Sequence, residues 1–246
     1  HIKQSKAPVG KTYVFLDEIQ NVPDFQKVVN SLFLDESLDI YITGSNAYFL
    51  SGELATLLSG RYVTIDMLPL SFREFIQLNS DSEVQTMAQW YRRYVEVGSF
   101  PYASAFSGDQ SGVHEYLRGV YNTIILRDVV SRYRITDTKM LESIVRFVFD
   151  NIGSPLSSKR IADALKSAGR KADPKTVEKY ISALQESFIL YEAKRYEVKG
   201  KQYLKLIEKY YVVDTGLREM LLGKRSVDIG HILENVIYLE LVRRKY

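Results

Sequence analysis

The sequence predicts an α/β protein with a parallel sheet and a helical layer, followed by a second module of helices and a β-ribbon. Three observations support this fold class. Strand-like and helix-like segments alternate over residues 12–66, which implies right-handed crossovers and parallel strands. After Pro69 the pattern becomes helical. From residue 139 to residue 213, three helices precede two strands.

The first expected strand carries the most informative residues of the chain. Residues 12–17 form an apolar run that ends on two adjacent carboxylates, Asp17 and Glu18. Open α/β sheets bind ligands at the carboxyl ends of their strands, and carboxylate oxygens suit Mg²⁺, although a capped turn would show the same residues. The other segments expected in this part are a helix over 24–34, strands over 38–43 and 61–66, and a short helix over 47–58.

The middle of the chain predicts a helical layer. Apolar residues recur at helical spacing in several segments, and Gly98-Ser-Phe-Pro101 interrupts the pattern. The expected helices cover residues 71–78, 84–97, 111–131 and 138–150.

The last part of the chain has the outline of a winged helix-turn-helix. Its second helix opens at Ser157-Ser158 and stops at Gly169. Its third helix has Asp173 as N-cap and Pro174 at the first position, which are both start signals. Two expected strands, 188–196 and 203–213, flank a hairpin tip at Lys199-Gly200-Lys201.

Composition excludes several classes of site. The chain has no cysteine, which excludes disulfides, thiol catalysis and Cys-based zinc sites, and its three histidines are far apart in the sequence. The net charge of +3 is too small to indicate nucleic acid by itself. There is no apolar run of about 18 residues and no signal peptide, so we expect a cytoplasmic protein without a membrane partner. The start at His1 and the end inside an amphipathic run indicate a piece of a longer protein.

Eight strings stand out along the chain: YVFLDEIQNVPDF, YITGSN, LSGRY, LPLSFREF, GSFP, ILRDVV, DTGL and GHILENVIYLEL. Together they resemble the archaeal and bacterial AAA+ ATPase family. Members join a P-loop ATPase domain to a winged helix and a restriction-nuclease-like domain. The resemblance implies a partial AAA+ core at 1–68, a helical lid-like region at 69–136, a winged helix-turn-helix at 137–216 and the start of a truncated nuclease-like domain at 217–246.

The resemblance also implies roles for individual residues in binding Mg²⁺ and ATP. Asp17 matches the Walker B aspartate of the Mg²⁺ shell, and Glu18 matches the residue that positions the attacking water. Asn46, with Ser45, matches the polar sensor of the γ-phosphate. Arg61 stands where an arginine is usual, either as a nucleotide contact across a subunit boundary or in a structural salt bridge.

A P-loop is missing from this pattern. Gly10-Lys11-Thr12 has the right last letters but leads into the Walker B strand, whereas a P-loop opens a helix. Only sixteen residues precede Asp17, and a βαβ unit needs about thirty. We therefore expect this chain neither to bind ATP tightly nor to hydrolyse it. The missing strand would leave an open sheet edge, which predicts self-association.

The winged helix-turn-helix is locally basic. Residues 157–179 hold seven lysines and arginines against three acids, a net of +4. These cations are Lys159, Arg160, Lys166, Arg170, Lys171, Lys175 and Lys179. Near the start of the third helix, Lys175, Thr176 and Lys179 are expected to contact double-stranded DNA, and the wing adds Lys199 and Lys201.

The basic module leaves alternatives open. Its helices could pack against the ATPase domain and present a solvated basic face. The whole chain could be a DNA-binding regulator with a non-catalytic α/β scaffold, or a module that couples nucleotide state to a partner. At the far end, Glu234 fits either a solvated helix face or one member of a metal site, and we expect no nuclease activity.

Overall fold

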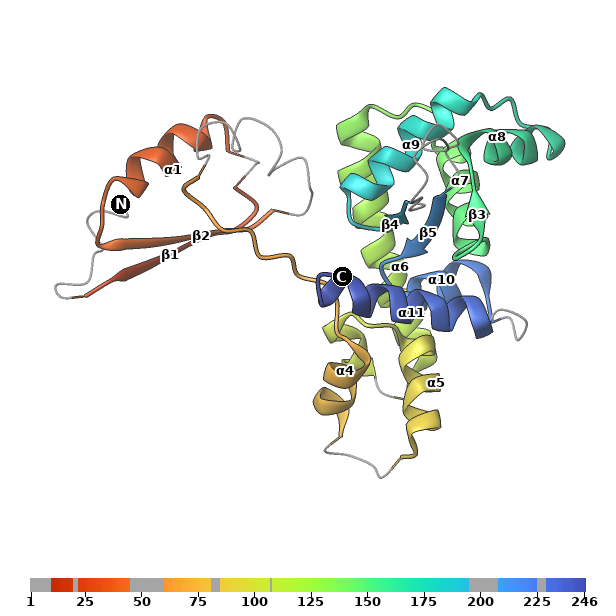
Figure 1. Cartoon of the computed structure of the whole chain (residues 1–246), viewed down its shortest axis with the longest axis horizontal. Helices are drawn as coiled ribbons and strands as arrows, with labels where there is room; N and C mark the ends of the chain where they lie inside the picture. The colour runs from red at the N-terminus through yellow and green to blue at the C-terminus, as the bar shows by residue number, and fades with distance from the viewer. Residues whose placement is uncertain are drawn as a thin grey trace, which may run out of the picture. The chain divides into compact units, whose positions relative to one another are not determined.

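The computed structural model describes residues 10–19, 22–44, 60–80, 85–106, 108–194, 208–224 and 229–246, without the side chains of 126 and 127. The chain divides into two compact units, His1–Ile65 and Asp66–Tyr246 (Figure 1). Within the described ranges, no helix is both long and apolar enough to cross a membrane.

The first unit is a small parallel sheet with one covering helix. Strand β1 (Thr12–Leu16) pairs in parallel with β2 (Leu38–Ile42), and α1 (Phe25–Phe33) connects them. Buried apolar residues of α1 pack on one face of the sheet: Val29 and Phe25 contact Ile19, and Leu32 contacts Val14 and Leu38. The parallel sheet and its helix confirm this part of the predicted fold.

The opposite face of this sheet carries exposed aromatic side chains. Tyr13, Phe15 and Tyr41 are 60%, 71% and 40% exposed, and the Phe15 and Tyr41 rings stack with centroids 5.0 Å apart. Alternate residues of a strand point to opposite faces, so the same pattern that buries Val14 exposes its neighbours. Self-association of the chain stays a prediction.

The predicted strand over residues 61–66 is wrong. The chain there pairs with neither described strand, since the sheet of the first unit contains only β1 and β2 within the described ranges. Val63, Ile65 and Met67 are 89%, 73% and 88% exposed. Alternating β-branched residues favour a strand, but a strand forms only where its backbone groups find a ladder partner. The expected helix over 47–58 lies outside the described residues.

The second unit begins with a helical layer. Helices α4 (Phe72–Asn79) and α5 (Met87–Val97) both start with a capping box, Ser71 with Glu74 and Thr86 with Gln89. A 3₁₀ helix, η3 (Pro101–Phe106), and α6 (Gln110–Asn122) follow. The faces of α4 and α5 meet through a buried aromatic cluster of Phe75, Trp90 and Tyr94.

The predicted helix over 111–131 is not one uniform helix. After α6 the backbone widens into a π-helix, η4 (Thr123–Ser131). Ile125 and Val129 of this segment are 4% and 0% exposed and pack in the main core. Apolar periodicity near 3.6 residues cannot separate α from π winding over nine residues, so the sequence could not predict the change.

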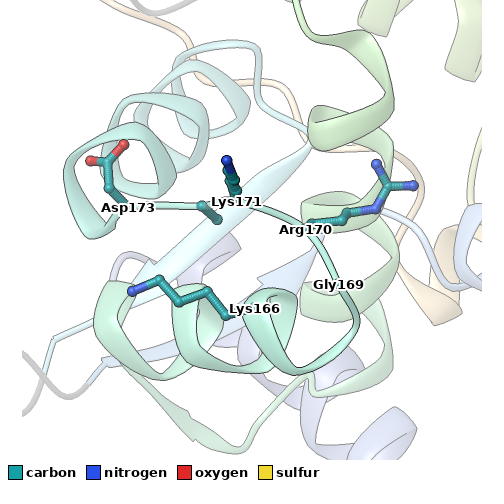
Figure 2. A pocket seen from close by; sticks show the side chains of 6 residues that line it. Lys166, Gly169, Arg170, Lys171 and Asp173 are labelled. Carbon is teal, nitrogen blue, oxygen red and sulfur yellow. The ribbon is translucent and has the colours of Figure 1, made fainter.

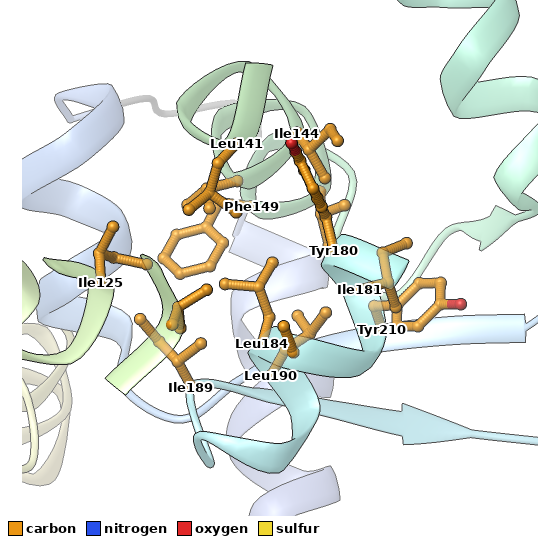
Figure 3. Packing of buried hydrophobic residues seen from close by; sticks show 14 of the residues in the cluster. Ile125, Leu141, Ile144, Phe149, Tyr180, Ile181, Leu184, Ile189, Leu190 and Tyr210 are labelled. Atoms are coloured by element: carbon orange, nitrogen blue, oxygen red, sulfur yellow. The ribbon is translucent and has the colours of Figure 1, made fainter. Parts of the chain in front are cut away.

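A compact group of helices and a small antiparallel sheet enclose the main hydrophobic core. Its elements are α7 (Thr138–Asp150), β3 (Pro155–Leu156), α8 (Ser158–Ser167), α9 (Pro174–Glu186), β4 (Leu190–Ala193) and β5 (Glu208–Val212). The strand order is β3-β5-β4, and both pairings are antiparallel. Figure 3 shows Leu141 and Phe149 of α7 packed against Leu184 of α9 and Ile189. The two-residue strand β3 is too short for any sequence pattern to indicate.

Two C-terminal helices pack on this core. Helix α10 (Thr215–Leu222) places Leu217 in the main core, where it is 0% exposed. Helix α11 (Ile229–Arg243) lies against β5 and buries Asn235 and Leu239. The side chain of Tyr238 stacks on the ring of Tyr211 at a centroid distance of 4.0 Å.

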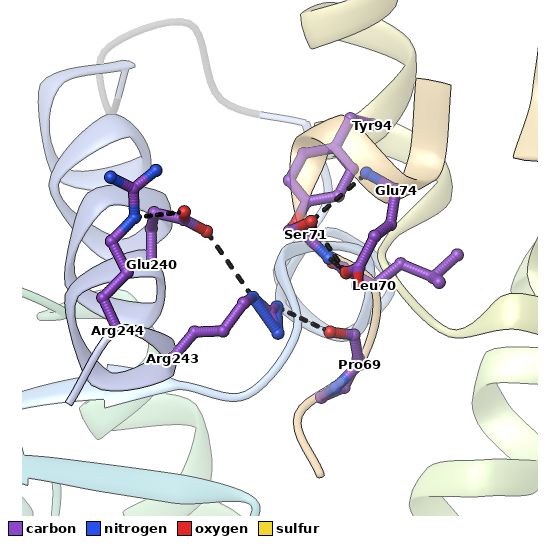
Figure 4. Close-up of polar contacts among 8 residues, drawn as sticks. All are labelled: Pro69, Leu70, Ser71, Glu74, Tyr94, Glu240, Arg243 and Arg244. Atoms are coloured by element: carbon purple, nitrogen blue, oxygen red, sulfur yellow. Dashed lines mark hydrogen bonds and ion pairs between the residues drawn. The ribbon is translucent and has the colours of Figure 1, made fainter. Parts of the chain in front are cut away.

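The end of α11 holds the start of the helical layer. Arg243 Nη2 donates to the carbonyl oxygen of Pro69 at 2.7 Å, and its Nε lies 3.5 Å from Glu240 (Figure 4). The next carbonyl, that of Leu70, accepts a hydrogen bond from the Tyr94 hydroxyl at 2.9 Å. The entry of the chain into the second unit is therefore held by residues from both ends of that unit.

Candidate functional site

The carboxyl ends of β1 and β2 bring two polar side chains together. The parallel register pairs Leu16 with Ile42, so the next residues, Asp17 and Thr43, also face one another. The Thr43 hydroxyl donates a short hydrogen bond to Asp17 Oδ1. The backbone N–H of Thr43 donates to the carbonyl of Leu16 at 2.9 Å, which fixes this alignment.

Glu18 has an unusual backbone at the same sheet end. Its φ is +48°, in the left-handed region that non-glycine residues rarely adopt at a cost of about 1 kcal/mol. Its backbone N–H donates to Thr43 Oγ1 at 3.2 Å. Thr43 therefore contacts both members of the expected acidic pair: it donates to Asp17 and accepts from Glu18. Residues held in this backbone region often belong to functional sites.

Thr43 was not among the predicted site residues. The sequence held a signal for Thr43. Asp17 follows β1 and Thr43 follows β2, and the parallel register places these two residues side by side. The predicted partners, Ser45 and Asn46, lie outside the described residues. Their contact with Asp17 stays a prediction.

The oxygen donors at this sheet end suit a partly hydrated Mg²⁺ ion better than a metal ion coordinated only by protein side chains. Within the described ranges, no group of three or more histidine, aspartate or glutamate side chains could hold a metal ion. Mg²⁺ commonly keeps several waters and takes only one or two carboxylates, together with substrate phosphates. Asp17 is exposed and Thr43 offers a hydroxyl oxygen, so the pair suits such a partly hydrated ion.

The side chain of Arg61 lies against α1. Its Nη1 donates to Asn30 Oδ1 at 3.3 Å, and its guanidinium carbon lies 5.6 Å from the centre of the Phe33 ring. These partners differ from the carboxylate of the expected structural salt bridge. Contact of Arg61 with a nucleotide stays a prediction.

Gly10-Lys11-Thr12 does not have the geometry of a phosphate loop. Gly10 has a φ of +99°, and the strand β1 begins at Thr12. A phosphate loop needs the backbone N–H groups of a helix N-terminus, and these residues lead into a strand. The structure thus agrees with the prediction that this Gly-Lys-Thr is not a P-loop.

The basic residues of α9 lie at the exposed start of that helix. Lys175 and Lys179 are exposed, whereas Thr176 is half-buried. The Thr176 hydroxyl donates to Asp173 Oδ2 at 2.6 Å, and its N–H donates to Oδ1 at 3.0 Å. These hydrogen bonds lower the pKa of Asp173. Thr176 therefore serves the helix cap, and contact of Lys175 and Lys179 with DNA stays a prediction. Lys199 and Lys201 lie outside the described residues.

Glu234 of α11 has structural partners on β5. It accepts hydrogen bonds from Lys209 Nζ at 2.8 Å and from the Tyr211 hydroxyl at 2.7 Å. The Lys209 hydrogen bond is the main cause that lowers the pKa of Glu234. These contacts fix α11 on β5 and give the carboxylate a role that needs no metal.

A buried carboxylate joins the helical layer to α10. Asp214 is fully buried and accepts hydrogen bonds from the N–H and hydroxyl of Ser99 and from the N–H of Leu217, the last at 2.7 Å. A Cβ on Gly98 would lie 2.6 Å from Asp214 Oδ1, and one on Gly216 would lie 2.8 Å from the Gly98 Cα. Burial raises the pKa of Asp214, while the hydrogen bonds oppose that rise. The GSFP string at residues 98–101 and the DTGL string at residues 214–217 thus contact each other in the folded chain.

Comparisons with known proteins agree with the architecture. A family model described as an AAA domain matches residues 1–76, and one described as "Domain of unknown function (DUF8612)" matches residues 88–228. The structure is similar to a Walker-type ATPase of Pyrococcus abyssi, with a TM-score of 0.55 and 14% identity, over 86% of this chain and 63% of that one. At that identity the similarity concerns the fold alone. The AAA domain match concerns the first part of the chain, and the similar structure supports an α/β fold with a helical layer.

Two curated relatives are similar over nearly the whole chain. An uncharacterized protein of Haemophilus influenzae is 42% identical over 246 residues, which are 99% of this chain and 61% of that protein. An uncharacterized protein of Methanocaldococcus jannaschii is 30% identical over 241 residues, which are 95% of this chain and 53% of that protein. The chain thus spans little more than half of the length of these relatives.

Proposed function

This chain belongs to the family of the domain of unknown function DUF8612, and we propose that it is the core of an ATP-binding and ATP-hydrolysing AAA+ protein. The observation that carries the proposal is the convergence of Asp17, Glu18 and Thr43 at the carboxyl ends of two parallel strands. Ligands of open α/β sheets bind at this edge. The AAA domain match over residues 1–76 includes all three residues.

Each residue of this sheet end has a proposed task. Asp17 would hold the hydrated Mg²⁺, and the ion would supply positive charge to neutralise the phosphates. Thr43 orients the Asp17 carboxylate through its hydrogen bond. Glu18 accepts a hydrogen bond from the attacking water and so positions that water for the terminal phosphate. Asn46 and Ser45 are the proposed sensors of that phosphate, and Arg61 is proposed to contact a nucleotide held by a neighbouring copy.

The proposal is tested by comparing Mg–ATP binding by residues 1–246 with ATP hydrolysis by a longer relative. Isothermal titration of residues 1–246 with Mg–ATP is expected to show no tight binding, because Gly10-Lys11-Thr12 leads into β1 and offers no amide cradle. The Haemophilus influenzae relative is expected to hydrolyse ATP. Alanine at its position matching Asp17 should lower kcat at least about 100-fold, because metal-assisted charge stabilisation is worth several kcal/mol.

A matched control uses a half-buried carboxylate of the same sheet, the position matching Asp39 on β2, which should leave kcat unchanged. Tight binding of Mg–ATP by residues 1–246 would contradict the need for a P-loop. Turnover that is equal in the Asp17 and Asp39 variants would remove the catalytic assignment.

We further propose that residues 137–216 form a winged helix-turn-helix that contacts double-stranded DNA. The order α7-β3-α8-α9-β4-β5 and the antiparallel sheet of β3, β5 and β4 support this assignment. Helix α9 exposes Lys175 and Lys179 at its start, where recognition helices meet DNA. The alternative, a DNA-binding regulator with a non-catalytic α/β scaffold, shares this module and differs only in lacking ATP turnover.

DNA contact is tested by fluorescence anisotropy with a labelled duplex. The chain is expected to bind with an affinity that falls as salt rises. Lys175→Gln/Lys179→Gln should reduce the slope of log K against log salt by about two, since each phosphate contact contributes about 0.9. Lys139→Gln, an exposed cation on α7, is the control. Equal slopes for the wild type and the double variant would place the contact elsewhere.

A further inference from the structure

One side of helix α11 carries an exposed row of aliphatic side chains, the α11 stripe. Its members are Ile229, Leu233, Ile237 and Leu241, which are 65%, 44%, 50% and 44% exposed. They recur every four residues of one helix, and residues at this spacing are neighbours on a helix surface. The stripe therefore forms a continuous apolar ridge about 18 Å long.

The opposite side of α11 is already occupied. Asn235 and Leu239 are buried, and Asn235 is hydrogen-bonded to Val212 of β5. Val236 packs against the buried aromatic cluster of α4 and α5. A helix that is apolar on all sides is typical of a position buried between two layers of protein. The described part of this chain supplies a layer on one side of α11 and leaves the stripe exposed.

A lipid bilayer does not match this helix. α11 has 15 residues, whereas a helix that spans a bilayer needs about 20. A helix that lies on a membrane surface turns its polar side to water, but the side of α11 opposite the stripe packs on β5. The chemistry of the stripe therefore favours an apolar protein surface as its occupant.

The longer relatives contain additional chain that could form such a surface. This chain spans 61% of the Haemophilus influenzae relative and 53% of the Methanocaldococcus jannaschii relative, so more than a third of each lies outside the matched part. A βαβ unit with a P-loop accounts for about thirty of those residues. The remainder is long enough for a further domain, because domains typically have about 50 to 250 residues.

We propose that the segment that follows α11 in these longer proteins folds back and covers the α11 stripe with an apolar face of its own. α11 ends at Arg243, so a segment joined there is tethered close to Leu241, the last residue of the stripe. A short tether gives an effective concentration in the millimolar range. This advantage favours a tethered segment over a second copy of the chain, which has to be captured from solution.

The α11 stripe is separate from the residues proposed to meet DNA. The open pocket at the turn between α8 and α9 has no residue of α11 in its lining. Figure 2 shows that Lys166, Arg170 and Lys171 of this lining point in different directions. The cover of the stripe depends on neither the DNA contact nor ATP turnover, so its failure would leave both of those proposals standing.

The first test compares residues 1–246 with the Haemophilus influenzae relative. Leu233→Gln/Ile237→Gln makes the middle of the stripe polar, and glutamine is a good helix former. In residues 1–246 this variant should leave the urea midpoint of unfolding unchanged, because both side chains are exposed. At the matching positions of the relative, trypsin should release the further segment at least about tenfold faster, since cleavage follows the population of the open form.

A matched control makes two other exposed apolar residues polar. Leu78→Gln/Met87→Gln changes residues of α4 and α5 that are 55% and 65% exposed. It should change neither the urea midpoint of residues 1–246 nor the rate of cleavage of the relative.

Hydrogen exchange gives a second readout that needs no substitution. The amides of residues 229–243 should exchange at least about tenfold more slowly in the relative than in residues 1–246, because a second covering layer makes local opening rarer. This comparison decides the question if the glutamine variant of the relative does not fold. Equal exchange in the two proteins would contradict the proposal.

Three other results would overturn it. Cleavage of the relative's stripe variant at the rate of its control would mean that the segment does not cover the stripe. A loss of stability in residues 1–246 would mean that the stripe is already covered within this chain. If light scattering shows a dimer of residues 1–246 that Leu233→Gln/Ile237→Gln separates, the occupant is a second copy.

Discussion

Asp214→Ala is expected to lower the free energy of unfolding by about 3 to 5 kcal/mol, because several buried donors lose their acceptor at once. The carboxylate binds the N–H and hydroxyl of Ser99 and the N–H of Leu217, in a space closed by Gly98. Alanine would leave these groups buried without a partner and would remove the N-cap of α10. Urea unfolding followed by circular dichroism measures the loss.

A matched control exists on α7. Asp137 is also a helix N-cap, but it is exposed, and its carboxylate accepts from the N–H of Met140 at 2.9 Å. Asp137→Ala should therefore cost only about 1 kcal/mol. A loss for Asp214→Ala no larger than that of the control would mean that the Ser99 contact contributes nothing to stability. Asp214→Asn should fall between the two, because its amide retains one acceptor oxygen.

Asn235→Ala is expected to lower the free energy of unfolding by about 2 to 4 kcal/mol. Asn235 is completely buried, accepts from the N–H of Val212 at 2.8 Å and donates to the carbonyl of the same residue at 2.9 Å. The side chain thus pairs with β5 as a neighbouring strand would. Alanine would leave both backbone groups of Val212 buried and unpaired, next to a small cavity.

Urea unfolding and hydrogen exchange of the Val212 amide test this second prediction. The amide should exchange faster in the variant by local opening of α11. Asn151→Ala is the control: Asn151 is half-buried, and its side-chain amide donates to the carbonyl of Phe147 at 2.8 Å. It should cost about 1 kcal/mol. Unchanged exchange of Val212 would show that α11 is not held by Asn235.

Predictions from short stretches of sequence succeeded where the signal and the structure are both local. The apolar run before Asp17 forms β1, and the helical spacing after Asp24 forms α1. Asp173 caps α9 and Pro174 takes its first position, as expected. These features depend on a few neighbouring residues, so one chain without any partner information suffices to predict them.

The acidic sheet end was only partly predictable. Asp17 and Glu18 were identified from the end of an apolar run, and the structure adds Thr43, which contacts both. Thr43 becomes a site residue only through the register of β1 with β2. The left-handed backbone of Glu18 likewise has no signature in the residues around it.

The sequence by itself determined the locally encoded elements, such as β1, α1 and the capped start of α9, and where the carboxylates and basic residues stand along them. The tertiary structure alone decided which of these segments find partners. Residues 61–66 have the composition of a strand but meet no ladder neighbour among the described strands, whereas Asp214 meets Ser99 across 115 positions of chain. Local propensity is encoded in adjacent residues, but hydrogen-bond satisfaction and burial depend on groups brought together only by folding.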